Sequence, residues 1–166
     1  MLFMKRFAVC ILLAAIIMIF TFFFKIPLVT GGYIHLGDAA IYLAASVLGP
    51  IAAFSAAFGS ALADFVGGYY VFIAPTFIIK GLMGWIAGYY ISKADNSKRF
   101  WILILCEGIM VVGYFFVHAV IHEWSFTTVE VSMDCLQAFA GILVGIFFCA
   151  LGDHIRIEGG FYDLRG

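Results

Sequence analysis

Two charged residues in adjacent apolar runs of this chain could either bind a ligand or hold helices together. Asp64 and Lys80 each continue a row of small residues at four-residue intervals. These rows are Ala52, Ala56 and Ser60 before the aspartate, and Gly84 and Gly88 after the lysine. Such rows let helices approach closely in lipid, and a charge at a membrane-helix centre costs roughly 2.5–3.5 kcal/mol. The pattern therefore predicts a close-packed helix pair joined by an Asp64–Lys80 ion pair, which we assign to the scaffold rather than to ligand contact.

A second group of polar residues lies in the last two long apolar runs. Helical periodicity places Glu107, Tyr114 and His118 on one stripe. It places Asp134 and Gln137 on one face of the next run. Aromatic rings with a few convergent polar groups are the usual lining of a small-molecule site. The candidate substrate contacts are Tyr33, His35, Tyr114, His118, Asp134 and Gln137.

Each of these side chains also has a purely structural interpretation. Glu107 is either a protonated or paired carboxylate of the core or a ligand contact. His118 either donates to a backbone carbonyl one turn back or contacts a ligand. The carboxamide of Gln137 needs partners in lipid, and its donors and acceptor suit a heterocycle or a hydroxyl group.

One spacing points to a different class of protein. His118 and His122 lie one helical turn apart, as two metal ligands would, and Glu123 follows them. The order is not HExxH, and no third ligand is evident. The alternatives to a transport protein are thus an intramembrane metalloenzyme using His118 and His122, or a non-transporting structural membrane subunit. We expect no catalytic residue, no bound metal and no cofactor, and the chain has no Walker A motif with which to hydrolyse ATP itself.

Composition places all of these residues in a membrane protein. The 166 residues are 65% hydrophobic and 11% charged, with a mean hydropathy of +1.12, whereas soluble domains carry about 25% charged residues. At about 20 residues per crossing, six helices fill the chain. The net charge of −1 carries no information about nucleic acid, but no basic patch suggests such a partner, and the four cysteines show no CxxC spacing.

The expected fold is all-α, a single domain over residues 1–166 with six transmembrane helices. We place the helices at residues 7–24, 38–48, 51–66, 75–91, 100–121 and 130–151, and a cytoplasmic tail at 152–166. Residues 25–36 and 122–129 are expected to be loops. A carboxylate at Asp38 suits the positive end of the second helix.

Lysine and arginine are distributed unequally between the two sides of such a bundle. Seven of them fall on the side of both termini, and Lys25 alone falls opposite. The seven are Lys5, Arg6, Lys93, Lys98, Arg99, Arg156 and Arg165. By the positive-inside rule, both termini face the cytoplasm. The candidate contacts would then line a recess that opens outward.

Two segments carry a family resemblance. GGYIHLGDAAIYLAASVLGP (31–50) and GSALADFVGGYYVFIAPTFIIKGLMGWIAGYYIS (59–92), together with GYFF and a glutamine on the last two helices, resemble the substrate-binding S component of an energy-coupling factor (ECF) transporter. The resemblance covers essentially the whole chain. It implies a six-helix protein of the prokaryotic cell membrane that captures a vitamin or vitamin precursor from outside.

The resemblance also implies partners, namely a transmembrane coupling subunit and two cytoplasmic ATPases. The docking surface would be the first helix, where Cys10 and Ala14 replace the family's Ala-x3-Ala pattern. Asp134-x2-Gln137 stands where relatives often have Asn-x2-Gln, and the Met-His start of the nickel and cobalt branch is absent. Within the family the chain is most similar to the hydroxymethylpyrimidine and vitamin B6 group.

Overall fold

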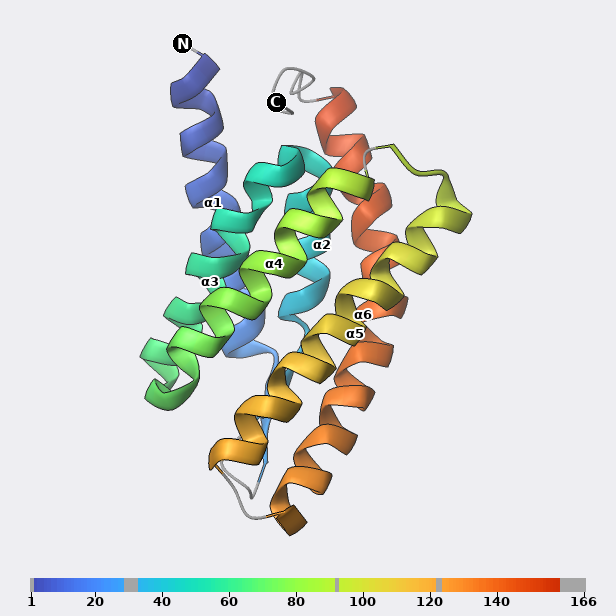
Figure 1. Cartoon of the computed structure of the whole chain (residues 1–166). Helices are drawn as coiled ribbons and strands as arrows, with labels where there is room; N and C mark the ends of the chain where they lie inside the picture. The colour runs from blue at the N-terminus through green and yellow to red at the C-terminus, as the bar shows by residue number, and fades with distance from the viewer. Residues whose placement is uncertain (1, 29–32, 92, 122–123, 159–166) are drawn as a thin grey trace.

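A computed structural model describes residues 2–28, 33–91, 93–121 and 124–158 of the chain. The helices are α1 (Leu2–Phe23), α2 (Gly37–Leu48), α3 (Ala52–Gly67), α4 (Ile73–Ile91), α5 (Asn96–Ile121) and α6 (Trp124–Glu158). Two short 3-10 turns, η1 (Gly49–Ile51) and η2 (Tyr70–Phe72), flank α3. The helices run alternately up and down, so the start of α1 and the end of α6 lie at the same end of the bundle (Figure 1).

Within the described residues, five helical segments are long and apolar enough to cross a membrane. One of them, Gly37–Gly67, comprises α2, η1 and α3 together and is 31 residues long. Because α2 alone has only 12 residues, about 18 Å at 1.5 Å per residue, it is too short to span the hydrocarbon core by itself. The mostly helical membrane bundle is as expected, while six separate crossings and their direction stay predictions.

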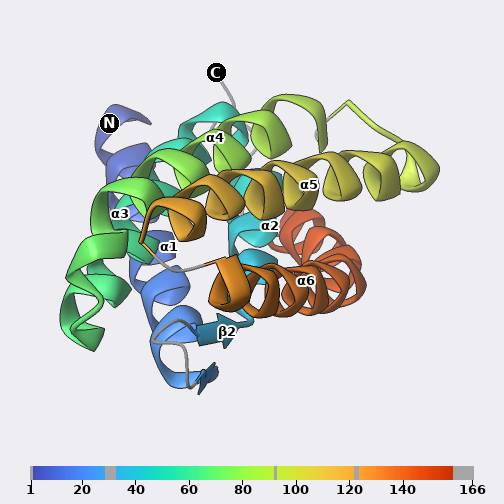
Figure 2. The same ribbon diagram turned by 60° about the horizontal axis from the view of Figure 1, so that its bottom comes forward.

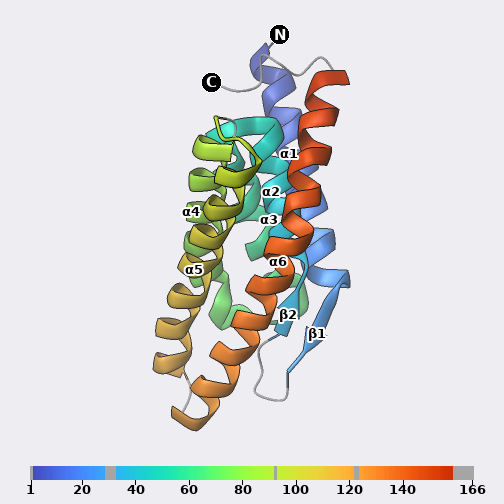
Figure 3. The same ribbon diagram turned by 90° about the vertical axis from the view of Figure 1, so that its right-hand side faces the viewer.

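The segment expected to be a loop between α1 and α2 contains a small antiparallel hairpin. Strand β1 (Lys25–Pro27) pairs with β2 (Tyr33–His35), with Ile26 opposite Ile34. The all-α expectation missed this pair because three-residue strands are too short to show alternation. The hairpin lies at the end of the bundle away from the chain termini (Figure 3).

The last helix is longer than expected at both ends. It runs from Trp124 to Glu158, so most of the expected 122–129 loop and the start of the expected 152–166 tail are helical; residues 159–166 lie outside the described part. Polar residues end a hydrophobic run without ending a helix.

Near the C-terminal end of α6, Arg99 of α5 contacts Asp153 at 2.5 Å, and Arg156 lies 3.6 Å from the same carboxylate.

Helix α2 forms the centre of the bundle. Every residue from Gly37 to Leu48 is buried, and Figure 2 shows the helix enclosed by its neighbours. Its sequence is apolar or small on all faces, which is the pattern of a fully buried helix. Asp38 in its first turn is therefore carried into the interior, where a carboxylate requires partners.

Helices α3 and α4 pack through the small-residue rows, as predicted. A Cβ at Gly84 would lie only 2.8 Å from the Ala56 Cβ. One at Gly88 would overlap the carbonyl oxygen of Gly49 and lie 2.8 Å from the nitrogen of Pro50. Gly49 itself has a φ of 65°, a left-handed conformation that favours glycine. The turn between α2 and α3 is thus held against α4 by backbone contact.

Substituting Gly88→Ala should destabilise the fold by about 1–3 kcal/mol, because the added methyl group cannot be accommodated without moving the backbone of the turn. The free energy of unfolding in mixed micelles measures this change. Gly108→Ala on α5 is the matched control, since its added Cβ meets no packing neighbour within 4 Å among the described residues. Equal stability of the two variants would contradict the close α4 contact.

Candidate functional site

The buried charges are paired differently from the prediction. Lys80 Nζ lies 2.5 Å from Asp38 Oδ1, and both side chains are fully buried. The predicted Asp64–Lys80 pair is therefore wrong. Helical spacing placed Lys80 correctly on the inner face of α4, but α2 lies between the other helices and supplies the nearer carboxylate. The ion pair joins α2 to α4 at the centre of the bundle.

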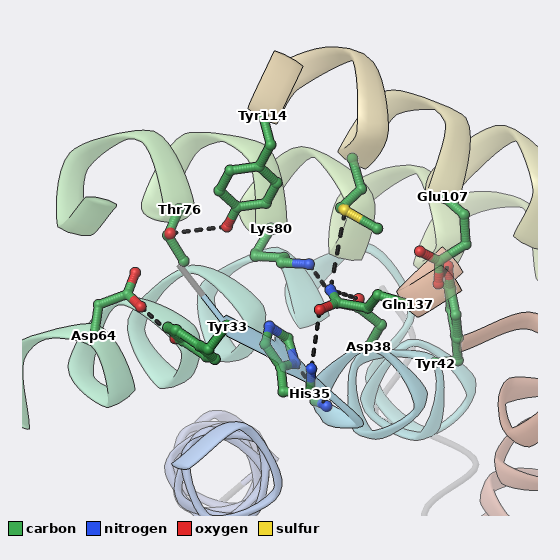
Figure 4. A network of polar contacts seen from close by, with 12 residues as sticks. Tyr33, His35, Asp38, Tyr42, Asp64, Thr76, Lys80, Glu107, Tyr114 and Gln137 are labelled. Atoms are coloured by element: carbon green, nitrogen blue, oxygen red, sulfur yellow. Dashed lines mark hydrogen bonds and ion pairs between the residues drawn. The ribbon is translucent and has the colours of Figure 1, made fainter. Parts of the chain in front are cut away.

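Gln137 extends this pair to α6 and to the hairpin. Its Nε2 donates to Asp38 Oδ2 at 2.7 Å, and its Oε1 accepts the backbone N–H of His35 at 3.0 Å. Figure 4 shows the carboxamide between these two groups. Both ends of the amide are engaged by protein groups, so Gln137 positions the hairpin in addition to facing the site.

His35 is held as a neutral imidazole. Its Nδ1 accepts the backbone N–H of Gly37 at 2.9 Å, which requires an unprotonated Nδ1. Burial lowers the pKa of His35 to about 4, and the neighbouring Lys80 and Lys25 contribute to the lowering while Asp38 opposes it. The end of β2 is thus fixed to the first turn of α2.

Asp64 has a different partner from the one expected. The hydroxyl group of Tyr33 donates to Asp64 Oδ1, which ties β2 to the end of α3. The ring of Tyr33 also packs against Tyr69, with centroids 4.4 Å apart. These contacts hold the hairpin over the end of the α3–α4 pair (Figure 4).

The structure brings all six candidate contacts together around one pocket. The pocket is formed by β2, α3, η2, α4, α5 and α6. Its cavity volume is about 30 Å³, or about 370 Å³ when the open space at its mouth is counted. Its lining residues are Tyr33, His35, Asp64, Phe72, Thr76, Tyr114, His118, Glu130, Asp134 and Gln137. Six elements contribute, so the site exists only in the assembled bundle.

Polar contacts across the pocket fix its walls. His118 Nε2 of α5 lies 3.4 Å from Asp134 Oδ2 of α6. The hydroxyl groups of Thr76 and Tyr114 are 2.8 Å apart, which joins α4 to α5. The ring of Phe72 lies 5.6 Å from that of His118. The arrangement offers aromatic faces and hydrogen-bonding groups to a small molecule.

Sequence reasoning missed three of the lining residues and misassigned a fourth. Thr76 and Glu130 each precede a recognised residue by one helical turn, Lys80 and Asp134 respectively, so the same-face rule could have found them. Phe72 lies in a 3-10 turn and gave no periodic signal. Asp64 was assigned to the scaffold but also lines the pocket.

Glu107 lies away from the pocket. Its Oε1 accepts a hydrogen bond of 2.8 Å from the Tyr42 hydroxyl group, and both residues are buried between α2 and α5 (Figure 4). The contact is that of a core carboxylate. No group of three or more metal-ligating side chains occurs within the described ranges; His122, on which the metalloenzyme alternative depends, lies outside them.

A comparison with protein families decides the class of protein. A family model described as "ECF-type riboflavin transporter, S component" matches residues 1–151. The chain belongs to this family. The predicted resemblance is thereby confirmed, and the chain is a membrane component of a vitamin transporter, not an enzyme. The metalloenzyme alternative is not favoured.

Two relatives resemble this S component over most of their length. An uncharacterized protein of Pyrococcus woesei is 35% identical over 128 residues, which cover 75% of this chain and 86% of the relative. The thiamine precursor transporter HmpT of Lactococcus lactis subsp. cremoris is 28% identical over 141 residues, which cover 84% of this chain and 81% of the relative.

Substituting Lys80→Met should lower the free energy of unfolding by about 3–5 kcal/mol, because it leaves the buried Asp38 carboxylate without its cation. The double variant Asp38→Asn/Lys80→Met should recover much of the loss, since no unpaired charge then remains and the oxygen of the introduced carboxamide can still accept from Gln137. Unfolding in mixed micelles measures both. Lys98→Met, which removes an exposed pair with Asp95, is the control and should leave the free energy of unfolding unchanged. A similar loss of stability in Lys80→Met and Lys98→Met would argue against a structural role for the buried pair.

The state of His35 predicts a pH dependence of stability. The unfolded chain binds a proton at His35 below about pH 6.5, whereas the folded chain does so only near pH 4. As the pH is lowered from about 6.5 to about 4, the free energy of unfolding should therefore fall by up to about 1.4 kcal/mol per pH unit. Above about pH 6.5, His35 should add nothing to the pH dependence. His35→Asn should flatten this slope when thermal unfolding is followed from pH 7 to 4.5. An identical slope in the variant would show that His35 is not buried and neutral.

Proposed function

We propose that this S component captures a small water-soluble vitamin or vitamin precursor in the pocket between β2, α4, α5 and α6. One observation carries the proposal: the six residues chosen as ligand contacts from sequence come from three elements and line a single pocket. Such convergence of aromatic and polar side chains is typical of a binding site for a small molecule.

The substrate we favour is hydroxymethylpyrimidine or a vitamin B6 compound. The Lactococcus relative is named a thiamine precursor transporter, whereas the family description names riboflavin. The cavity volume of the pocket is only about 30 Å³, well below the 300–1,000 Å³ usual for ligand pockets, so its walls must move apart to admit any ligand. This size favours a molecule with one ring over the three fused rings of riboflavin.

The substrate would enter from outside the cell. Lys93, Lys98 and Arg99 lie at or near the α4–α5 connection, at the same end as the start of α1. A cluster of basic residues at that end of the bundle supports its placement on the cytoplasmic side of the membrane. The membrane would be the plasma membrane of a prokaryote. The hairpin and the pocket would then face the exterior.

Delivery inward would require partners, a transmembrane coupling subunit and two cytoplasmic ATPases. An apolar groove between α1 and α3 suits the coupling subunit, and Cys10 and Ala14 both line it. The two helices are joined beside this groove, because Ser55 Oγ of α3 donates to the Cys10 carbonyl at 2.9 Å. An apolar groove of this kind can pack against another membrane helix.

Binding of hydroxymethylpyrimidine and pyridoxine to the purified protein, measured by isothermal titration calorimetry, tests the proposal. One of the two should bind, and His118→Ala should raise its dissociation constant about tenfold or more, which corresponds to about 1.4 kcal/mol. Val120→Ala on the same helix is the control, since Val120 is 87% exposed on the outer surface. Equal affinities in the two variants would remove the site from this pocket, and absence of any small-molecule binding would favour a structural subunit.

A further inference from the structure

The pocket carries an excess of acidic groups. Asp64, Glu130 and Asp134 line it, and their exposed fractions are only 1%, 2% and 7%. Among its lining residues, as far as the chain is described, none is a lysine or an arginine. The basic groups of the lining are the imidazoles of His35, which is held neutral by Gly37, and His118.

Two lysines lie behind the wall of the pocket and have partners there, although each ammonium group also lies over a lining ring: Lys80 is 5.4 Å from the centroid of Tyr114, and Lys25 is 5.3 Å from that of Tyr33. Lys80 is paired with Asp38 at 2.5 Å beneath the pocket. The Lys25 ammonium group lies over aromatic rings, 4.3 Å from the centroid of Phe22 and 4.9 Å from that of Tyr69. Neither forms an ion pair with one of the three pocket carboxylates within the described residues.

Two carboxylate oxygens in the pocket are available as acceptors. Asp64 Oδ2 is buried and has no hydrogen-bond partner among the described residues, and Asp134 Oδ2 has only the long contact with His118 described above. In that contact, His118 Nε2 lies 3.4 Å from the oxygen. A buried acceptor without a donor lowers the stability of the protein. A ligand that donates N–H or ammonium hydrogens to both oxygens would remove this penalty and gain binding free energy.

We propose that the pocket selects its ligand by charge: it accepts a neutral or cationic aromatic heterocycle that carries amine hydrogens, and it rejects carboxylated and phosphorylated forms of the same ring. Asp64 and Asp134 accept the donor hydrogens, while Tyr33, Phe72 and Tyr114 contact the ring. An added anion would meet three carboxyl groups in a poorly solvated space, where like charges repel strongly. This inference rests on the proposed function.

The B6 compounds provide a matched series, because pyridoxamine, pyridoxine and 4-pyridoxate differ only in one ring substituent, an aminomethyl, a hydroxymethyl or a carboxylate group. We expect pyridoxamine to bind more tightly than pyridoxine, which has no amine hydrogens, and 4-pyridoxate and pyridoxamine 5′-phosphate to bind at least about 100-fold more weakly than pyridoxamine. Calorimetry with the wild-type protein gives all four affinities. Equal or tighter binding of either anion overturns the inference.

Asp134→Asn tests the charge itself, because it removes one negative charge with little change in shape. It should weaken pyridoxamine binding about tenfold and reduce the discrimination against 4-pyridoxate by a similar factor. Asp95→Asn, in the exposed α4–α5 connection, removes the same charge at a distance and should leave every affinity unchanged. An unaltered pyridoxamine to 4-pyridoxate ratio in Asp134→Asn, with thermal unfolding like that of the wild type, contradicts the assignment.

The two proposals fail in different ways. If an anionic member binds best and His118→Ala still weakens its binding, the pocket remains the substrate site and only the charge inference is wrong. If pyridoxamine and hydroxymethylpyrimidine, which both carry amine hydrogens, fail to bind, the charge inference is wrong. If the B6 affinities are indifferent to His118→Ala, the site itself has been misplaced and the proposed function fails too.

Discussion

The buried Lys80–Asp38 ion pair is the interaction on which the rest of this structure depends. Two charges that each cost several kcal/mol to remove from water lie together at 2.5 Å in the centre of an apolar bundle. Because either charge alone would be unstable there, α2 and α4 are fixed relative to each other. Gln137 uses the second oxygen of Asp38, so α6 and the hairpin are positioned by the same pair.

The candidate site is built on this scaffold in two layers. The lower layer satisfies the buried charges, and the upper layer presents side chains whose polar atoms are only partly used, such as Asp64 and Asp134. Tyr33 belongs to both, because it bonds Asp64 and lines the pocket. Binding a ligand would thus bear directly on the hairpin, and through Gln137 on the centre of the bundle.

The helical periodicity of the sequence predicted which faces of α3 to α6 point into the bundle. The small-residue rows predicted the α3–α4 contact, and the one-turn spacings on α5 and α6 predicted that His118, Asp134 and Gln137 face inward. The partner of Lys80 could not be found in this way. Spacing along one helix gives the face of a charge, whereas its partner depends on which helix packs there, and Asp38 is 42 residues away. The hairpin could not be predicted from the sequence pattern either, because each of its strands has only three residues.

Mass spectrometry of the small molecule released from the freshly purified protein tests the central claim most directly. If the pocket is a substrate site, a water-soluble single-ring compound should accompany the wild-type protein in near-stoichiometric amount and be clearly reduced in His118→Ala purified in parallel. Release of the same compound in equal amount from both proteins, or of no small molecule from the wild type after growth with the candidate vitamins, would contradict the account.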